Sequence, residues 1–265
     1  QIVGAEALAR FRREQHRTPD VWFDEAWRWG LGSALELLAI EIAVGSLDAM
    51  PPGTYLAVNA SPESLVSAEL QALLARVPGE RIVVELTEHA RVDDYDAVSN
   101  AIGELRARGV RLAVDDAGAG FASFQHILRL QPDIIKLDRS LTSGVDVNPV
   151  RHALASAMVT FAASLGAKIC AEGIETEGEI VSLQQLGIAL GQGYFLGKPG
   201  PLPFKAPPAG VWFRSAPPAA TDEETPPAST VSPVLRSPKR LAALRATGLL
   251  DTDAEEAFDR FTRLA

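Results

Sequence analysis

Residues 111–120 read RLAVDDAGAG, and they decide the fold class because a short apolar run ends there in two adjacent aspartates. Leu112, Ala113 and Val114 suit a buried strand, whereas Asp115 and Asp116 place two negative charges at its end. Two glycines stand among the next four residues. Carboxylates that follow a buried strand are typical of parallel sheets and barrels, in which functional groups gather beyond the carboxyl ends of the strands.

Similar short runs of apolar and β-branched residues recur along the chain, and they are expected to form strands. The strand candidates are 1–5, 55–59, 81–86, 110–115, 133–137, 167–171 and a short segment near 188–193. Longer segments between them carry apolar residues at helical spacing and stop before a glycine, as at Gly109, Gly166 and Gly187. This alternation predicts parallel strands with right-handed crossovers, in a doubly wound sheet or an eight-stranded barrel.

The polar residues at the strand ends favour the barrel, because every strand of a parallel barrel delivers its carboxyl end to the same face. Each strand candidate ends in, or runs into, a group that binds cations or phosphates. These groups are Glu6, Asn59, Glu85, Glu88, Asp115, Asp116, Lys136, Asp138, Glu172, Glu175 and Gln192. The fold class predicted is therefore α/β, a TIM-type (β/α)8 barrel whose carboxylates converge with Arg10 and Lys136 on one mouth.

So many carboxylates in one mouth predict bound cations, since like charges a few ångströms apart repel strongly where the effective dielectric constant is low. The four histidines form no pair at metal-ligand spacing and the chain has one cysteine, so two Mg²⁺ or Mn²⁺ ions are favoured over zinc. Consecutive aspartates point to different sides, so one can bridge two ions while its neighbour holds the second. Such a pair of ions suits in-line displacement at phosphorus, with Lys136 orienting or deprotonating the attacking water.

Composition narrows the classes of protein that remain. A chain of 265 residues with 47% apolar residues is long enough for one large barrel core. Glu36 and Glu41 interrupt the longest apolar stretch, so no membrane span is expected. The net charge of −9 disfavours binding to a nucleic acid polymer. A lone Cys170 and the absence of a signal-peptide pattern after Gln1 predict a cytoplasmic location.

The C-terminal part of the sequence differs from the rest in amino-acid composition. More than half of the 18 prolines fall between Pro199 and Pro238, so residues 206–237 are expected to form an edge segment and linker after a barrel of residues 1–205. Residues 238–265 return to helical periodicity, with Thr252 and Glu255 as a possible capping box. A short helical tail is therefore predicted for 238–265.

The strand-end motifs, taken in order, resemble one known family. EALAR, VNAS, ELTE, DDAGAG, KLD, AEGIE and QGYFLGKP resemble the motifs of the EAL-domain family, phosphodiesterases that linearise cyclic di-GMP, and the resemblance runs from about residue 2 to residue 199. It implies hydrolysis of cyclic di-GMP to linear pGpG in a TIM-type barrel with two Mg²⁺ or Mn²⁺ ions, and a homodimer. Residues 238–265 also resemble the opening helices of a GAF domain, of which the rest is missing.

The resemblance also implies a role for each matching residue. The first metal would be held by Glu6, Asn59, Glu85 and Asp115, and the second by Asp116 and Glu172 with Asp115 shared. Lys136 would act on the water, and Glu88 would anchor the loop after Asp116. The nucleotide would be contacted or supported by Leu8, Arg10, Asp138, Glu175 and Gln192.

The sequence departs from the family pattern in two places. DDAGAG stands where the family has DDFGTG, so Ala117 and Ala119 replace an aromatic residue and a threonine. The strand that precedes the EAL motif in the family is absent, which leaves seven strands and a gap in the barrel. Two alternatives therefore stay open. One is a catalytically impaired receptor that binds cyclic di-GMP and signals through its C-terminal region, and the other is an unrelated barrel hydrolase with paired carboxylates.

Overall fold

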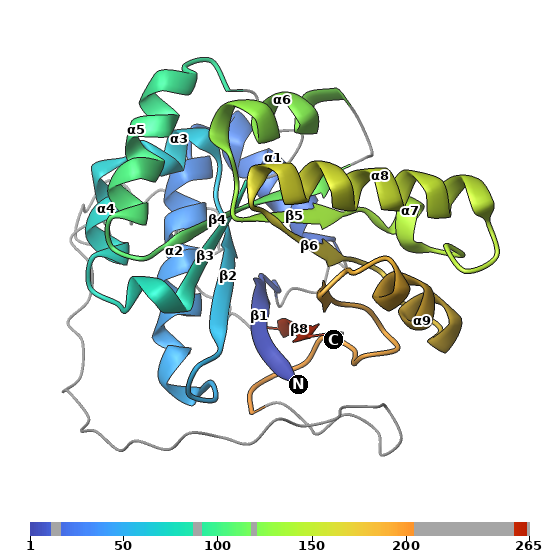
Figure 1. The fold of residues 1–265 in the computed structure, drawn as a ribbon. Coiled ribbons are helices and arrows are strands. Elements are labelled where there is room, and N and C mark those ends of the chain that lie inside the picture. Colours follow the sequence, from blue (N-terminus) through green and yellow to red (C-terminus); the bar gives the residue numbers. More distant parts are fainter. Residues whose placement is uncertain (12–16, 87–91, 118–120, 204–256, 264–265) are drawn as a thin grey trace.

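A computed structural model describes residues 1–11, 17–86, 92–117, 121–203 and 257–263 (Figure 1). Seven parallel strands curl into a barrel in chain order, and an eighth strand closes it in the antiparallel direction. The strands are β1 (Ile2–Leu8), β2 (Tyr55–Asn59), β3 (Ile82–Leu86), β4 (Arg111–Ala117), β5 (Ile134–Leu137), β6 (Lys168–Ala171), β7 (Leu190–Gly191) and β8 (Ala257–Arg263). The seven strands predicted from the sequence correspond to β1–β7.

Helices follow most of the strands and surround the barrel (Figure 1). They are α1 (Pro19–Arg28), α2 (Gly32–Gly45), α3 (Pro62–Leu65), α4 (Ala68–Leu74), α5 (Tyr95–Arg106), α6 (Phe121–Leu130), α7 (Arg139–Thr142), α8 (Pro149–Leu165) and α9 (Glu177–Gln185), with two 3-10 turns at Leu47–Ala49 and Gly79–Arg81. None of the helices in the described part of the chain is long and apolar enough to cross a membrane.

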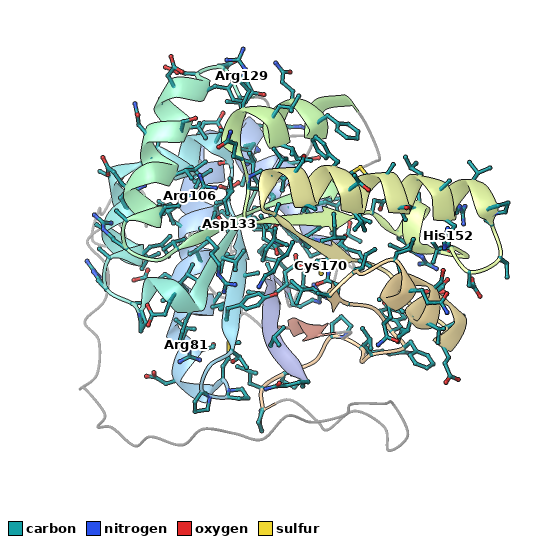
Figure 2. All side chains as sticks on the ribbon, viewed as in Figure 1. Arg81, Arg106, Arg129, Asp133, His152 and Cys170 are labelled. Atoms are coloured by element: carbon teal, nitrogen blue, oxygen red, sulfur yellow. The ribbon has the colours of Figure 1, made fainter. Side chains whose placement is uncertain are left out.

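Alternation along each strand sorts the side chains between two cores. On β3, Ile82, Val84 and Leu86 belong to the core between the barrel and its helices, whereas Val83 belongs to a cluster inside the barrel. Successive side chains of a strand point to opposite faces, so Glu85 shares the inward direction of Val83. The inner cluster also contains Cys170, which is fully buried and is labelled in Figure 2.

The helix ends follow local sequence signals. Gly166 ends α8 with φ at 72°, a left-handed conformation that glycine adopts without steric cost. Thr176 begins α9 with a capping box, in which its hydroxyl accepts a hydrogen bond from the Glu179 N–H and the Glu179 carboxylate accepts one from the Thr176 N–H. These ends fix where each crossover turns back towards the barrel.

The C-terminal segment differs from the prediction. Residues 257–263 form β8 rather than a helix, so the helical tail predicted for 238–265 is wrong over these residues. β8 pairs with β1, where Glu6 lies opposite Asp259, and with β7, where Gly191 lies opposite Thr262. The edges of β1 and β7 carry backbone N–H and C=O groups that need hydrogen-bond partners. Pairing with these edges favours a strand at residues 257–263 more than their helical periodicity favours a helix.

The barrel is consequently closed, and the strand expected to be missing is replaced by β8. Residues 257–263 thus belong to the barrel and not to a separate tail. The linker predicted at 206–237 and the capping box predicted at Thr252 and Glu255 lie outside the described residues.

Candidate functional site

One lysine stands at the centre of the charged residues that the strands deliver to the barrel mouth. The Lys136 Nζ lies 2.7 Å from Glu85 Oε2, 2.9 Å from Glu172 Oε1, 3.0 Å from Asp115 Oδ2 and 3.3 Å from Glu6 Oε2. The four carboxylates come from β1, β3, β4 and the end of β6. The structure therefore brings these four carboxylates and Lys136 together, whereas Asp138 and Glu175 make other contacts.

Two amides complete this group. Asn59 Nδ2 donates to Glu6 Oε1 at 2.9 Å, and Gln192 Nε2 donates to Glu172 Oε1 at 2.8 Å and to Glu6 Oε2 at 3.3 Å. Each amide thus holds a carboxylate that also contacts Lys136. We call Glu6, Asn59, Glu85, Asp115, Lys136, Glu172 and Gln192 the mouth cluster.

Burial and mutual repulsion shift the pKa values of the mouth cluster. Burial raises the pKa of Glu85 well above its usual range and that of Glu172 to about 8, against the opposing effect of Lys136. Burial also acts on Glu6, but Lys136, Asn59 and Gln192 together lower its pKa. For Lys136, burial favours the neutral amine, yet Glu172, Glu6, Glu85 and Asp115 raise its pKa well above normal. Lys136 is therefore the cation that compensates the cluster.

The acidic side chains also form two groups able to hold metal ions. Oxygens of Glu6, Glu85 and Asp115 lie within 4.8 Å of one another, and so do oxygens of Asp115, Asp116 and Glu172. Asp115 belongs to both groups, as expected for a ligand shared by two ions. The donors are all carboxylate oxygens, which fit hard divalent cations such as Mg²⁺ and Mn²⁺.

Backbone geometry at the end of β4 separates the two aspartates. Asp116 has φ at 52°, in the left-handed region that asparagine and aspartate tolerate better than most residues. Its N–H donates to Asp115 Oδ1 at 2.8 Å, which leaves Asp115 Oδ2 for Lys136. Asp115 thus contacts Lys136, and an oxygen of Asp116 lies within 4.8 Å of Asp115 and Glu172 oxygens.

Four of the residues predicted to contact or support the nucleotide lie at the end of β1 or shortly after β1, β5 and β6. Leu8 is the last residue of β1 and is half-buried, and Arg10 follows it with Nη1 donating to the Ala9 carbonyl at 2.9 Å. Asp138 caps α7 by accepting from the Ser140 N–H at 2.9 Å. Glu175 is exposed and pairs with Arg139 at 2.7 Å. Glu88 lies outside the described residues, as does Ala119.

Three residues near Glu172 were not predicted as part of the site. Arg139 contacts Glu175, Thr142 Oγ1 donates to the Glu172 carbonyl, and the Glu179 carboxylate accepts from the N–H groups of Glu175 and Thr176. The capping-box spacing of Thr176 and Glu179 is visible in the sequence and could have indicated the last of these. No sequence signal indicates the contacts of α7 with the loop after β6.

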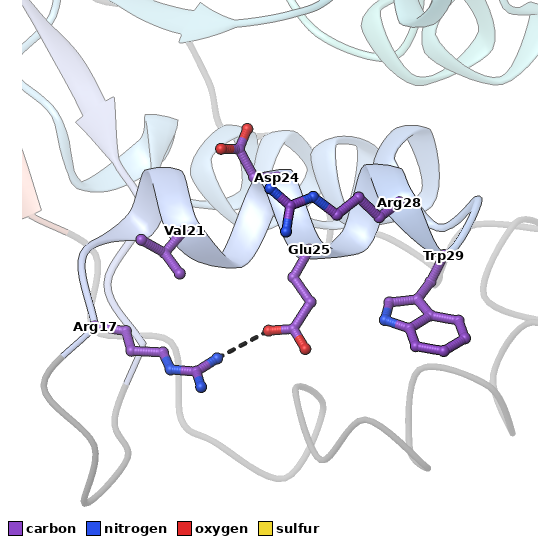
Figure 3. A pocket seen from close by; sticks show the side chains of 6 residues that line it. All are labelled: Arg17, Val21, Asp24, Glu25, Arg28 and Trp29. Atoms are coloured by element: carbon purple, nitrogen blue, oxygen red, sulfur yellow. Dashed lines mark hydrogen bonds and ion pairs between the residues drawn. The ribbon is translucent and has the colours of Figure 1, made fainter.

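A groove of about 700 Å³ lies apart from the mouth cluster, along α1 (Figure 3). Among the described residues it is lined by Arg17, Val21, Asp24, Glu25, Arg28 and Trp29. Arg17 and Glu25 form an exposed ion pair at 2.9 Å across it. Since these residues belong to α1 and to the positions just before and after it, the groove shares no residue with the strand ends.

Comparison with known proteins identifies the family. A family model described as "EAL domain" matches residues 1–199. The chain belongs to the EAL-domain family. This match ends before residues 238–265, and nothing in the comparisons supports their resemblance to a GAF domain.

Curated relatives with EAL-type sequences include named enzymes. The chain is 30% identical over 212 residues to the bifunctional diguanylate cyclase/cyclic di-GMP phosphodiesterase MucR of Pseudomonas aeruginosa, covering 76% of this chain and 31% of MucR. It is 28% identical over 208 residues to the cyclic di-GMP phosphodiesterase PdeF of Escherichia coli, covering 74% of this chain and 28% of PdeF. The chain thus spans less than a third of either relative.

Solved structures agree with this assignment. The MucR phosphodiesterase in complex with c-di-GMP matches with a TM-score of 0.66 and 31% identity, over 76% of this chain and 86% of that one. The manganese/cy-diGMP complex of BlrP1 from Klebsiella pneumoniae matches with a TM-score of 0.61 and 29% identity, over 71% of this chain and 49% of that one. The described part of residues 1–199 therefore has the fold of an EAL-type barrel.

Proposed function

We propose that this EAL domain hydrolyses cyclic di-GMP to linear pGpG with two divalent metal ions. The observation that carries the proposal is the mouth cluster, in which two overlapping groups of carboxylates surround Lys136. The named activities of MucR and PdeF and the c-di-GMP and manganese in the matched structures support the choice of substrate and metal.

The residues divide into three sets by what they would do. Glu6, Glu85 and Asp115, with Asn59 beside Glu6, would hold one ion, and Asp115, Asp116 and Glu172 would hold the other. Bound ions at this mouth would supply Lewis acidity and would neutralise charge on the phosphodiester. Leu8, Arg10, Asp138, Glu175 and Gln192 would contact or support the nucleotide.

Lys136 would act as a charged hydrogen-bond donor. Its ammonium group, held protonated by the surrounding carboxylates, can orient the attacking water and the phosphoryl oxygens. In the reaction the attacking water gives up one proton and its oxygen forms a bond to phosphorus. The bond from phosphorus to the 3′ oxygen breaks and that oxygen takes up one proton, so that one water molecule is consumed and no net proton is released. The sequence left open whether Lys136 orients or deprotonates the water, and its contacts with four carboxylates favour the charged ammonium group that orients it.

The test is incubation of the chain with cyclic di-GMP and Mn²⁺, followed by chromatographic separation of pGpG. Linear pGpG formed in proportion to enzyme and abolished by chelation is the expected result. Binding of cyclic di-GMP without product would instead support the receptor hypothesis. An absence of both binding and product would contradict both. Homodimer formation stays a prediction, which light scattering of the same sample measures.

A further inference from the structure

The loop that carries Glu172 is held mainly by residues that belong to other elements. Its backbone is fixed at both ends, because the Glu172 N–H donates to the Leu137 carbonyl at 3.1 Å and the Ile174 N–H donates to the Gln192 carbonyl at 3.1 Å. Between these points lies Gly173, with φ at 65°. We call residues 172–176 the β6–α9 loop.

The short helix α7 packs directly onto this loop. A Cβ atom added at Gly173 would lie 2.5 Å from Arg139 Cγ and 2.8 Å from Arg139 Cβ, so the aliphatic stem of Arg139 rests on the Gly173 backbone. The guanidinium group continues over the loop to Glu175 Oε1 at 2.7 Å. Thr142, one turn further along α7, donates to the Glu172 carbonyl. Two residues of α7 thus contact the loop at Glu172, Gly173 and Glu175.

The placement of α7 is fixed by the same strand that carries Lys136. Asp138 follows β5 and caps α7 through the Ser140 N–H. Arg139 therefore stands three residues after Lys136, while the residues it covers stand next to Glu172. Contacts of α7 with the β6–α9 loop link the lysine and the carboxylate that meet at 2.9 Å in the mouth.

We propose that Arg139 is a positioning residue, which clamps the β6–α9 loop and so sets the position of Glu172 for the second metal ion and of Glu175 for the nucleotide. The proposal rests on the proposed function for the roles of Glu172 and Glu175. The stem contact matters more than the ion pair, because Arg139 and Glu175 are 59% and 41% exposed and an exposed pair contributes little by itself. A second metal ligand displaced by a fraction of an ångström binds its ion less tightly.

The experiment compares Arg139→Ala and Arg139→Lys with the unmodified chain. Binding of Mn²⁺ alone is followed through the loss of its free-ion EPR signal, and kcat and KM for cyclic di-GMP are measured at saturating Mn²⁺. Arg139→Ala is expected to weaken the weaker of the two Mn²⁺ sites about tenfold, at the lower end of losses seen when outer contacts of metal ligands are removed. It should lower kcat more than it changes KM. Arg139→Lys keeps an aliphatic stem and a positive charge, so it should retain most of the Mn²⁺ affinity and most of kcat.

Arg76→Ala serves as the matched control, because Arg76 is an exposed arginine elsewhere on the barrel. A second variant tests the contact itself. Gly173→Ala should impair Mn²⁺ binding by pressing its methyl group against Arg139, and Arg139→Ala should relieve part of that loss when the two are combined, a non-additive result. The part of the Gly173→Ala effect that Arg139→Ala does not relieve would come from the strained φ of residue 173.

The outcomes separate the two proposals. If the unmodified chain turns over cyclic di-GMP and Arg139→Ala leaves both Mn²⁺ affinity and kcat unchanged, the clamp is refuted and the function stands. If the unmodified chain binds Mn²⁺ but forms no pGpG, the function fails and the clamp is judged by Mn²⁺ affinity alone. If the unmodified chain binds no Mn²⁺, both proposals are refuted. A lower melting temperature with unchanged Mn²⁺ affinity would make Arg139 a structural residue only.

Discussion

The interior of the barrel has two layers that differ in chemistry although the same strands build them. The lower layer contains Val83, Ala113, Ile134 and Cys170, all buried in one apolar cluster. Two residues further along each strand stand the charged groups of the upper layer. These are Glu85, Asp115, Lys136 and Glu172, in the same strand order.

The comparison shows how one barrel separates stability from function. A shift of two residues keeps a side chain pointing inward, so the strand pattern carries both layers to the interior. The apolar layer is packed without charge, whereas the charged layer is kept together by Lys136 against the desolvation of four carboxylates. We therefore expect changes in the lower layer to leave the chemistry unchanged and changes in the upper layer to alter it.

The largest effect is expected at the centre of the charged layer. Lys136→Met should lower kcat for cyclic di-GMP by about 10²–10³-fold, because a charged donor fixed in a buried site is lost. Without metal, the same change leaves buried carboxylates uncompensated and should lower the free energy of unfolding by about 3–5 kcal/mol. Steady-state kinetics with Mn²⁺ and urea denaturation with EDTA measure the two effects.

Ile134→Val is the matched control for Lys136→Met, two residues away on β5. It should cost about 0.5–1.5 kcal/mol of stability and leave kcat unchanged. Equal losses of kcat in the two variants would show that the layers are not separate.

Metal binding should act on the charged layer alone. With Mn²⁺ at about 100 times its Kd, the free energy of unfolding should rise by about 2.7 kcal/mol, since the ion binds the folded state. Asp115→Asn should remove most of this gain, because Asp115 belongs to both carboxylate groups. Thermal melts with and without Mn²⁺ measure it, and Glu104→Gln, at an exposed position of α5, is the control that should keep the gain. Stabilisation that persists in Asp115→Asn would place the ion elsewhere.

The pairing of β8 with β1 tests how much closure of the barrel contributes to the stability of the fold. Asp259 lies opposite Glu6, and Asp259→Pro removes a backbone N–H and restricts φ in the middle of β8. The free energy of unfolding should fall by about 1–3 kcal/mol, which corresponds to roughly 2–4 °C in Tm per kcal/mol for a domain of this size. Asp259→Ala, which keeps the N–H and leaves φ unrestricted, is the matched control for the backbone change. Identical melting curves for the two variants would mean that the pairing of β8 with β1 does not stabilise the barrel.

The smallest effect concerns a carboxylate outside both layers. Burial would raise the pKa of Glu179, but the N–H groups of Gly144, Glu175 and Thr176 lower it below its usual value. As the pH falls, Glu179 is protonated at a higher pH in the unfolded chain than in the folded chain. The stability that the charged Glu179 contributes above pH 4.5 is therefore lost below that pH. Urea denaturation at pH 7 and pH 3.5 measures how much the free energy of unfolding falls between the two pH values. This fall should be about 1 kcal/mol smaller in Glu179→Gln than in the unmodified chain.

Glu63→Gln, in the first turn of α3, is the control for this experiment because Glu63 is exposed. It should leave the pH dependence as it is. If Glu179→Gln loses as much stability between the two pH values as the unmodified chain does, the backbone hydrogen bonds to Glu179 do not stabilise its charged form.

The sequence by itself determined the positions of the seven parallel strands and the meeting of several strand-end carboxylates at one mouth. Both follow from local pattern: a strand has a period of two, and parallel strands joined by crossovers bring their carboxyl ends to one face. Glu85, Asp115 and Glu172 could therefore be predicted to meet although they are far apart in the chain. The motifs also predicted the EAL family, which the comparisons confirmed.

Only the tertiary structure decided which groups touch within that mouth and what closes the barrel. Whether Lys136 lies among four carboxylates depends on the register of neighbouring strands, which no local pattern encodes. The tail at 257–263 was predicted as a helix because its periodicity is helical, but open strand edges provide backbone partners that a local pattern does not reveal. The contact of Arg139 with Gly173 arises in the same way, from a helix and a loop that become neighbours only when β5 and β6 pair.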